Sequence, residues 1–353
     1  MNNIKNIAKN KFDRHKVGVT SFLFHTCNLN CDFCFLGKVN QVTNEYINHG
    51  FDAFIPYIRN PEFNSVAFHI SGGEVFADFI EDKYIDLYEK RLLEINNEAK
   101  LYNKNIDWRF LTNLIFKKTD RIDKLFKSLK DHGVNVVINT SFDFSCRFRN
   151  KENLRIFFEN FKHYEDYIAA CNIMSSEAMY KCLLEPGLCN DQEKAEVEMF
   201  YKIHDYVSKH EKLKYVLQIT GMVSFGDENI DALTIHDSNK FKKMYYYLLE
   251  NYPFFFGNLL SPFVDDKQDK ALFSLDETVD INRSFKGSPC AVNCDCEEEV
   301  AKYIIKHDCL NCKYYTKCET ACGLFSHDRF DECMRKLVID YYFNHKDMLN
   351  VKE

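Results

Sequence analysis

The sequence predicts an α/β fold in which a parallel sheet carries helices on its outer side. Strand-like runs alternate with amphipathic helical runs up to about residue 250 of the 353-residue chain, and β-α units in series build parallel sheets. Hydrophobic residues make up 46% of the chain, enough to fill one large domain and a small one.

Six strand candidates are rich in β-branched and aromatic residues, and they span 18–24, 65–71, 107–112, 134–139, 167–172 and 213–219. Helix candidates with an apolar period near 3.6 residues lie between or after them, at 44–59, 81–102, 120–131, 151–162, 192–208 and 238–250. The stretch 251–288 contains Pro253, Pro262 and alternating charges, so we expect a connector with little regular structure there.

Three cysteines follow the first predicted strand, in Cys27-Asn-Leu-Asn-Cys31-Asp-Phe-Cys34. Thiolates at this spacing can ligate three irons of a 4Fe-4S cluster and leave the fourth iron without a protein ligand. The alternative is a zinc knuckle or a chance group of buried thiols. A zinc site would need a fourth Cys or His nearby, and His25 lies too close to Cys27 to complete a tetrahedron.

This spacing, with Phe33 as its aromatic residue, resembles the C-x-x-x-C-x-aromatic-C signature of the radical S-adenosylmethionine (SAM) family. The resemblance implies a partial (β/α)6 TIM-like barrel, which matches the six predicted units, with its chemistry at the carboxyl ends of the strands. It also implies a 4Fe-4S cluster to which SAM binds. In that family an electron from the cluster splits SAM to methionine and a 5′-deoxyadenosyl radical, which abstracts hydrogen from the substrate.

The second predicted strand ends in Ser-Gly72-Gly73-Glu74. Glycines at a strand end let a ligand approach the backbone, and a carboxylate beside them can accept hydrogen bonds from an ammonium group. The run resembles the G-G-E element of the same family, which implies that Glu74 holds the amino group of SAM. Taken alone, Gly-Gly-Glu is a common turn.

Two further strand ends carry short polar side chains, at Thr112-Asn113 and at Ser141-Phe-Asp143. They resemble the T-N and S-x-D elements of the family, which implies that they bind SAM. Phe144 stands where a glycine usually follows. These residue types are also ordinary turn formers.

Eight cysteines lie near the carboxyl terminus and resemble the SPASM extension of radical SAM enzymes, which binds two auxiliary 4Fe-4S clusters. The resemblance assigns Cys290, Cys294, Cys296 and Cys322 to the first cluster and Cys309, Cys312, Cys318 and Cys333 to the second. The first three cysteines are more crowded than in the family, so which of them ligate stays open. Zinc is the alternative metal.

Two weaker candidates remain for the chemistry itself. Cys171, one of four cysteines outside these sets together with Cys146, Cys182 and Cys189, is a candidate hydrogen-atom donor, or simply a small buried apolar residue. Asp227 is a candidate general base, or an ordinary solvent-facing loop carboxylate.

We expect four parts along the chain: a tail at 1–16, the barrel at 17–235, a helix and connector at 236–286, and a SPASM-like domain with a terminal helix at 287–353. No apolar run of about twenty residues and no signal-peptide pattern is present, so we expect a cytoplasmic protein without a membrane partner. The net charge of −7 indicates no nucleic-acid partner. Fifteen cysteines in a reducing compartment favour metal ligation.

The resemblance implies a SPASM-type radical SAM oxidoreductase that modifies a peptide or protein side chain and receives electrons from flavodoxin or ferredoxin. Only 26 residues precede Cys27, too few for an N-terminal peptide-recognition domain. We therefore expect recognition by the barrel mouth, by a separate peptide-recognition protein, or of a substrate without a leader. The alternatives are an anaerobic sulfatase-maturing oxidase, a radical SAM enzyme for small molecules, and a non-catalytic iron-sulfur electron-transfer protein.

Overall fold

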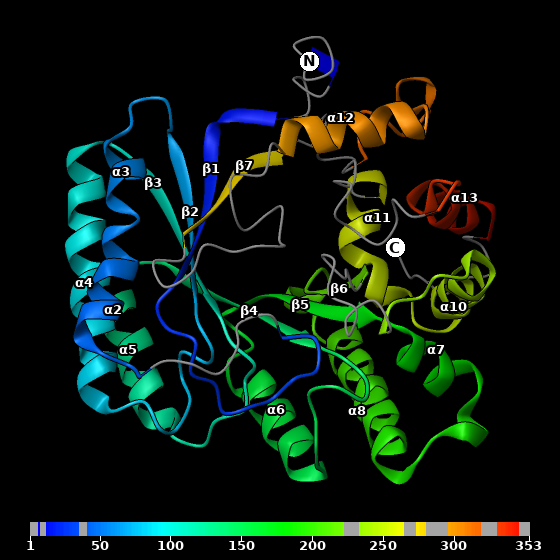
Figure 1. Cartoon of the computed structure of the whole chain (residues 1–353), viewed down its shortest axis with the longest axis horizontal. Coiled ribbons are helices and arrows are strands. Elements are labelled where there is room, and N and C mark those ends of the chain that lie inside the picture. Colours follow the sequence, from blue (N-terminus) through cyan, green and yellow to red (C-terminus); the bar gives the residue numbers. More distant parts are fainter. Residues whose placement is uncertain are drawn as a thin grey trace.

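The structure, a computed structural model, describes residues 6–7, 12–34, 41–221, 233–264, 273–279, 296–318 and 330–345. Its centre is a parallel sheet that curls into a half-barrel with helices on the outside (Figure 1). The strand order is β6-β5-β4-β3-β2-β1-β7, so the first six strands lie side by side in chain order. The predicted α/β class is therefore confirmed, and the curled half-barrel of parallel strands is consistent with a partial TIM-like barrel.

All six predicted strands form, although β1 begins earlier than expected. They are β1 (Phe12–Phe22), β2 (Ser65–Ser71), β3 (Asn105–Leu111), β4 (Val136–Phe142), β5 (Ile168–Ser175) and β6 (Leu217–Gly221). The helices that follow them include α4 (Asp82–Leu101), α5 (Thr119–Asp131), α6 (Lys151–His163), α8 (Asp191–Ser208) and α10 (Ser238–Asn251). These five helices begin and end within one residue of the predicted bounds.

The predicted helix at 44–59 is two helices, α2 (Asn44–Asp52) and α3 (Ile55–Arg59). Pro56 lies in the first turn of α3, and a proline there cannot continue the hydrogen-bond ladder of a preceding helix. Within the barrel part of the chain, the sequence did not predict α7 (Glu177–Leu184). It begins after Ser176, whose side chain accepts a hydrogen bond from Met179 N. Short 3-10 turns complete this part of the chain, at Pro186–Leu188, Glu211–Leu213 and Pro253–Phe256.

The stretch 251–288 was wrongly expected to have little regular structure. It contains α11 (Gly257–Val264) and a seventh strand, β7 (Phe273–Val279). β7 pairs in parallel with β1, with Val17 opposite Leu275. Its sequence, Phe-Ser-Leu-Asp-Glu-Thr-Val, lacks the continuous apolar run of a buried parallel strand, in keeping with its place at an edge of the sheet.

On β2 the large apolar side chains face outward to the helices and His69 faces the concave side of the sheet, as the period of two requires. On β2, Val66, Phe68 and Ile70 are fully buried, and the Phe68 ring stacks on Phe54 at a centroid distance of 4.3 Å. His69 alternates with them, half-buried, and its Nδ1 lies 3.3 Å from Thr20 Oγ1 on β1. The core therefore lies between sheet and helices.

The described carboxyl-terminal segments are α12 (Cys296–Lys306), a 3-10 turn at Cys309–Asn311 and α13 (Met334–His345). Contacts to α10 and α11 come from α13 and from Tyr314. Tyr341 of α13 stacks on Tyr246 of α10 at 4.1 Å, and Tyr314 meets Phe263 of α11 edge to face at 5.4 Å. Figure 1 shows α13 beside α10 accordingly.

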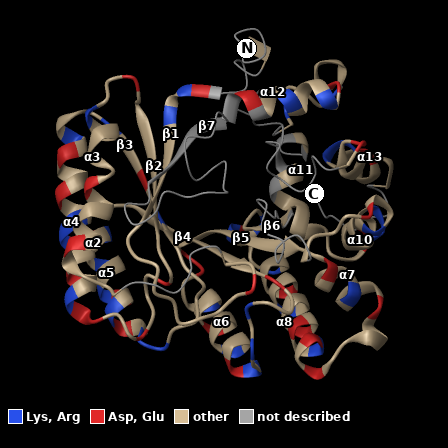
Figure 2. Ribbon diagram, in the orientation of Figure 1, with Lys and Arg blue, Asp and Glu red and all other residues tan. Residues whose placement is uncertain are grey.

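Charges of both signs alternate along the outer surfaces of the helices that cover the sheet (Figure 2). Among the helices in the described ranges, none has the length and apolar character needed to cross a membrane.

Candidate functional site

The loop that carries the first three cysteines is held against the end of β2 by the backbone. Gly73 N donates to Phe24 O at 2.9 Å, and a Cβ built on Gly73 would lie 1.9 Å from Thr26 O. Only a glycine permits this approach. The sequence suggested that a ligand comes close at this glycine, whereas the structure shows the protein's own cysteine loop there.

The three sulfur-bearing residues of this loop are accessible to different degrees. Cys27 and Cys31 are half-buried, and Cys34 is exposed, with Cys34 N donating to Cys31 O at 3.1 Å. Burial raises the pKa of the Cys27 thiol to about 11 and that of Cys31 to about 12, the latter against the opposing charge of Arg147. Thiolates in these positions therefore need a nearby cation, as metal ligation would provide.

Glu74 is 1% exposed, and both of its carboxylate oxygens accept hydrogen bonds from the protein. Oε1 accepts from Phe76 N at 3.0 Å and from Thr112 Oγ1 at 2.6 Å, and Oε2 accepts from Asn113 N at 2.6 Å. Burial raises the pKa of Glu74, and these hydrogen bonds oppose the rise. The carboxylate thus fixes the end of β3 to the end of β2.

Asn113 extends this link to the cysteine loop. Its Nδ2 donates to Asn28 Oδ1 at 2.9 Å and lies 3.8 Å from Cys27 Sγ. The same sulfur accepts from Leu29 N at 3.4 Å. The cysteine loop, Glu74 and the Thr112-Asn113 pair, found separately in the sequence, therefore form one connected hydrogen-bonded group.

Ser141 and Asp143 are joined by a residue that the sequence analysis missed, Arg147. Its Nε lies 3.0 Å from Asp143 Oδ2, its backbone N donates to Asp143 Oδ1 at 2.9 Å, and its two terminal nitrogens donate to Ser141 O at 2.7 Å and Ser141 Oγ at 2.6 Å. Both charged groups are buried. The guanidinium carbon lies 5.7 Å from the centre of the Phe33 ring, a cation–π distance.

Arg147 therefore places the aromatic residue of the cysteine loop beside the end of β4. The signal that would have revealed it is a basic residue four positions after Asp143, which can pair with that carboxylate across one turn.

The turn after β4 also explains Phe144, which replaces the expected glycine. Phe144 is fully buried against Phe200, with ring centroids 5.5 Å apart. The left-handed backbone falls instead on Ser145, with φ of 64°. Ser145 N donates to Glu196 Oε2 at 2.8 Å and its hydroxyl to Glu193 Oε1 at 2.9 Å, so two carboxylates of α8 hold the strained residue.

On the concave face next to this turn, β5 and β6 present amide and hydroxyl groups. Gln218 Nε2 donates to Asn172 Oδ1, and Thr220 Oγ1 lies 3.5 Å from the same oxygen. Cys171 occupies the other side of β5, fully buried in the apolar core, where burial raises the pKa of its thiol to about 12. Its role as a hydrogen-atom donor stays a prediction.

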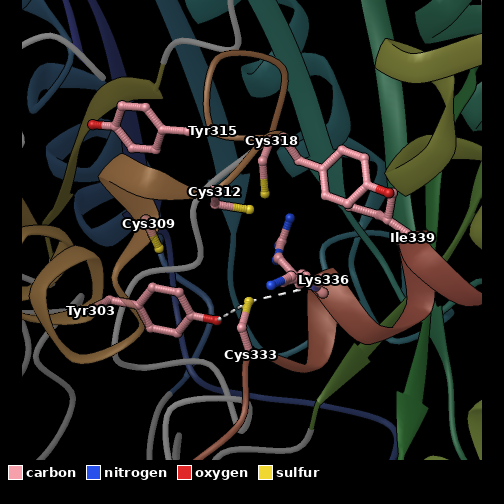
Figure 3. A pocket seen from close by; sticks show the side chains of 10 residues that line it. Tyr303, Cys309, Cys312, Tyr315, Cys318, Cys333, Lys336 and Ile339 are labelled. Atoms are coloured by element: carbon pink, nitrogen blue, oxygen red, sulfur yellow. Dashed lines mark hydrogen bonds between the residues drawn. The ribbon is translucent and has the colours of Figure 1, made fainter.

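Four of the carboxyl-terminal cysteines line one pocket (Figure 3). They are Cys309, Cys312, Cys318 and Cys333. Cys312 N donates to Cys309 O at 2.9 Å within a 3-10 turn, and Tyr303 Oη lies 3.6 Å from Cys333 Sγ. The set assigned to the second auxiliary cluster is therefore gathered around one space.

The other predicted cluster ligands are not placed. Cys290, Cys294 and Cys322 lie outside the described residues, as does the side chain of Cys296, although its backbone begins α12. The candidate general base Asp227 also lies outside the described residues.

The structure also reveals a group that the sequence analysis had left as buried thiols, Cys182 and Cys189 beside Glu193. No family model matches the chain, and no curated protein matches it.

Proposed function

We propose that this protein is a radical SAM enzyme that abstracts hydrogen from a peptide or protein side chain. The observation that carries the proposal is the placement of the three-cysteine loop at the carboxyl ends of β1, β2 and β3 in a parallel half-barrel. Gly73 and Asn113 bind that loop from two neighbouring strands. In barrels of this kind the strand ends are where chemistry occurs.

The residues fit a 4Fe-4S cluster with one open iron. Cys27, Cys31 and Cys34 would hold it, and the backbone donor Leu29 N at Cys27 Sγ is the kind of hydrogen bond that tunes such clusters. When bound, the cluster would supply the electron that splits SAM. Arg147 and the Ser141 hydroxyl lie one strand away, where a cationic group and a short polar side chain suit the carboxylate and hydroxyls of that cofactor.

The structure suggests an indirect role for Glu74. Because its carboxylate accepts three hydrogen bonds from the protein, its first task is to set the position of Thr112 and Asn113. A carboxylate has about four acceptor sites, and three of them on Glu74 are filled by the protein. One acceptor site therefore remains for a ligand ammonium.

A peptide substrate is favoured by the concave face of β4, β5 and β6. Asn139, Asn172 and Gln218 are half-buried there, and amide side chains both donate and accept hydrogen bonds, as the peptide backbone does. The carboxyl-terminal pocket supports a second metal centre, because four cysteines are the usual ligand set of a 4Fe-4S cluster. A four-cysteine zinc site has the same donors.

The deciding experiment is anaerobic reconstitution with iron and sulfide, followed by reduction with dithionite in the presence of SAM. We expect formation of 5′-deoxyadenosine and methionine in equal amounts. Cys309→Ala with Cys312→Ala should still form 5′-deoxyadenosine while losing about four irons. Reconstituted wild-type protein that carries a cluster and does not cleave SAM would be an electron-transfer protein, and the proposal would fail.

Substrate class can be tested with the same readout. Addition of a peptide-sized fraction of cell extract should increase 5′-deoxyadenosine formation, and the small-molecule fraction should not. The reverse result would favour the radical SAM enzyme for small molecules.

A further inference from the structure

A buried group of metal-ligand side chains lies between α7 and α8, separate from every cysteine set described above. Cys182 is in the last turn of α7, Cys189 precedes the first turn of α8, and Glu193 belongs to that first turn. They are 1%, 8% and 5% exposed. Their two sulfurs and one carboxylate oxygen all lie within 4.8 Å of one another.

The carboxylate of Glu193 is already oriented by the protein. Oε1 accepts from Lys181 Nζ at 2.5 Å and from Ser145 Oγ at 2.9 Å, which fills its two lone pairs. Oε2 accepts from Asn190 N at 2.9 Å, as part of the capping box of α8. One lone pair of Oε2 is therefore left for a further partner.

We propose that Cys182, Cys189 and Glu193 bind one zinc ion with three protein ligands and an open fourth position. Tetrahedral zinc, with bonds of about 2.3 Å to sulfur and about 2.0 Å to oxygen, places neighbouring ligand atoms about 3.5 to 3.8 Å apart. The three ligand atoms lie within 4.8 Å of one another, so they need to approach by only about 1 Å to reach that spacing. Soft thiolates select zinc over magnesium or calcium.

Charge balance supports the same assignment. Two thiolates and one carboxylate carry three negative charges, zinc carries two positive charges, and Lys181 supplies the third through its ion pair with Glu193. Two protons leave as the metal enters, so the buried site is neutral before and after binding. Magnesium and calcium prefer oxygen ligands, so a site for either ion would have oxygen ligands in place of the two thiols.

A disulfide or two unreactive thiols would explain why the sulfurs are close. Neither explains a third ligand atom that is held beside them by Lys181, Ser145 and Asn190. Through Ser145, the site also reaches the turn after β4 that carries Asp143 and Arg147. Zinc would therefore fix α7, α8 and that turn together.

The test is the zinc content of the full chain, purified without oxygen and without chelators. Cys182→Ala with Cys189→Ala should contain one zinc fewer per chain than the wild type. Cys171→Ala, which removes a fully buried cysteine of the core outside the group, should keep the wild-type zinc content. Equal zinc in the wild type and the double variant, or a Cys182–Cys189 disulfide found by mass spectrometry of the native protein, would overturn the proposal.

If the double variant does not fold, Glu193→Gln retains both thiols and gives an independent measurement. The zinc dissociation constant at this site should rise at least about tenfold, since a charged ligand is lost. X-ray absorption of the wild-type protein should show a zinc species with two sulfur and two lighter ligands, whereas zinc with sulfur ligands alone would place the metal in the carboxyl-terminal pocket and contradict the proposal.

Discussion

The two cysteine regions of this protein are held in different ways. The loop with Cys27 is fixed by residues far away in the sequence, because Gly73 and Asn113 contact it from β2 and β3. The carboxyl-terminal pocket is formed largely by local turns between Cys309 and Cys318, closed by Cys333 before α13. The first region should therefore keep its shape without metal, and the second should depend for its order on the metal that we propose there.

The largest effect should come from replacing Cys27, Cys31 and Cys34 together by alanine. We expect loss of about four irons and of all SAM cleavage, because no protein ligand remains for that cluster. The barrel should stay folded, as followed by the fluorescence of Trp108, the only tryptophan, which is fully buried between β3 and its helices. A variant whose barrel melts would show that the loop also depends on its metal.

Gly73→Ala should disrupt the same loop without touching a ligand. The added Cβ would collide with Thr26 O, and backbone cannot move aside as a side chain can. We expect a loss of about 1 to 3 kcal/mol or more in the free energy of unfolding, and poor iron uptake. Gly187→Ala is the matched control, since a Cβ there has nothing within 4 Å and should change stability little. Similar effects in both variants would contradict the close contact.

Glu74→Gln should weaken SAM binding about ten- to a hundredfold, in line with roughly 1.5 to 3 kcal/mol for a hydrogen bond to a charged group. Iron content should be unchanged, because Glu74 is not a ligand. Thr112→Val removes only one hydrogen bond to the carboxylate and should weaken binding less. Equilibrium binding of SAM to the reconstituted protein measures both, and an unchanged affinity in Glu74→Gln would show that the Gly-Gly-Glu run is an ordinary turn.

The smallest effect should be a pH dependence from His69 on the concave face. Burial, assisted by Arg109, lowers its pKa to about 4, below the value of about 6.5 in an unfolded chain. The unfolded state then binds more protons between these values, so stability should be full above pH 6.5 and should fall as the pH drops towards 4.

The midpoint of urea unfolding, followed through Trp108 fluorescence, measures this stability at each pH. Replacing His69 by glutamine should make the midpoint less dependent on pH. An equal pH slope in both proteins would assign the effect to other groups.

The sequence was sufficient to predict helices and strands where a pattern of apolar residues repeats locally. The alternation in β2 and the apolar period of α4 and α8 reproduced the observed elements closely. It failed at β7, because Asp276 and Glu277 in an edge strand do not need to be apolar. Sequence patterns also failed to predict contacts between residues that lie apart in the chain. No local pattern indicates that Ser145 contacts Glu196, or that Cys182 lies beside Glu193 across a 3-10 turn.

The pairing of β7 with β1 has a consequence for synthesis on the ribosome. About 250 residues separate Phe22 from Phe273, which at 5 to 20 residues per second takes roughly 13 to 50 s. During that time one edge of β1 lacks its final neighbour, although the charges of Asp13 and Lys16 at its start discourage pairing with other chains. The last cysteines emerge only after β7, so a metal centre in the carboxyl-terminal pocket could assemble only after all seven strands of the sheet have been synthesised.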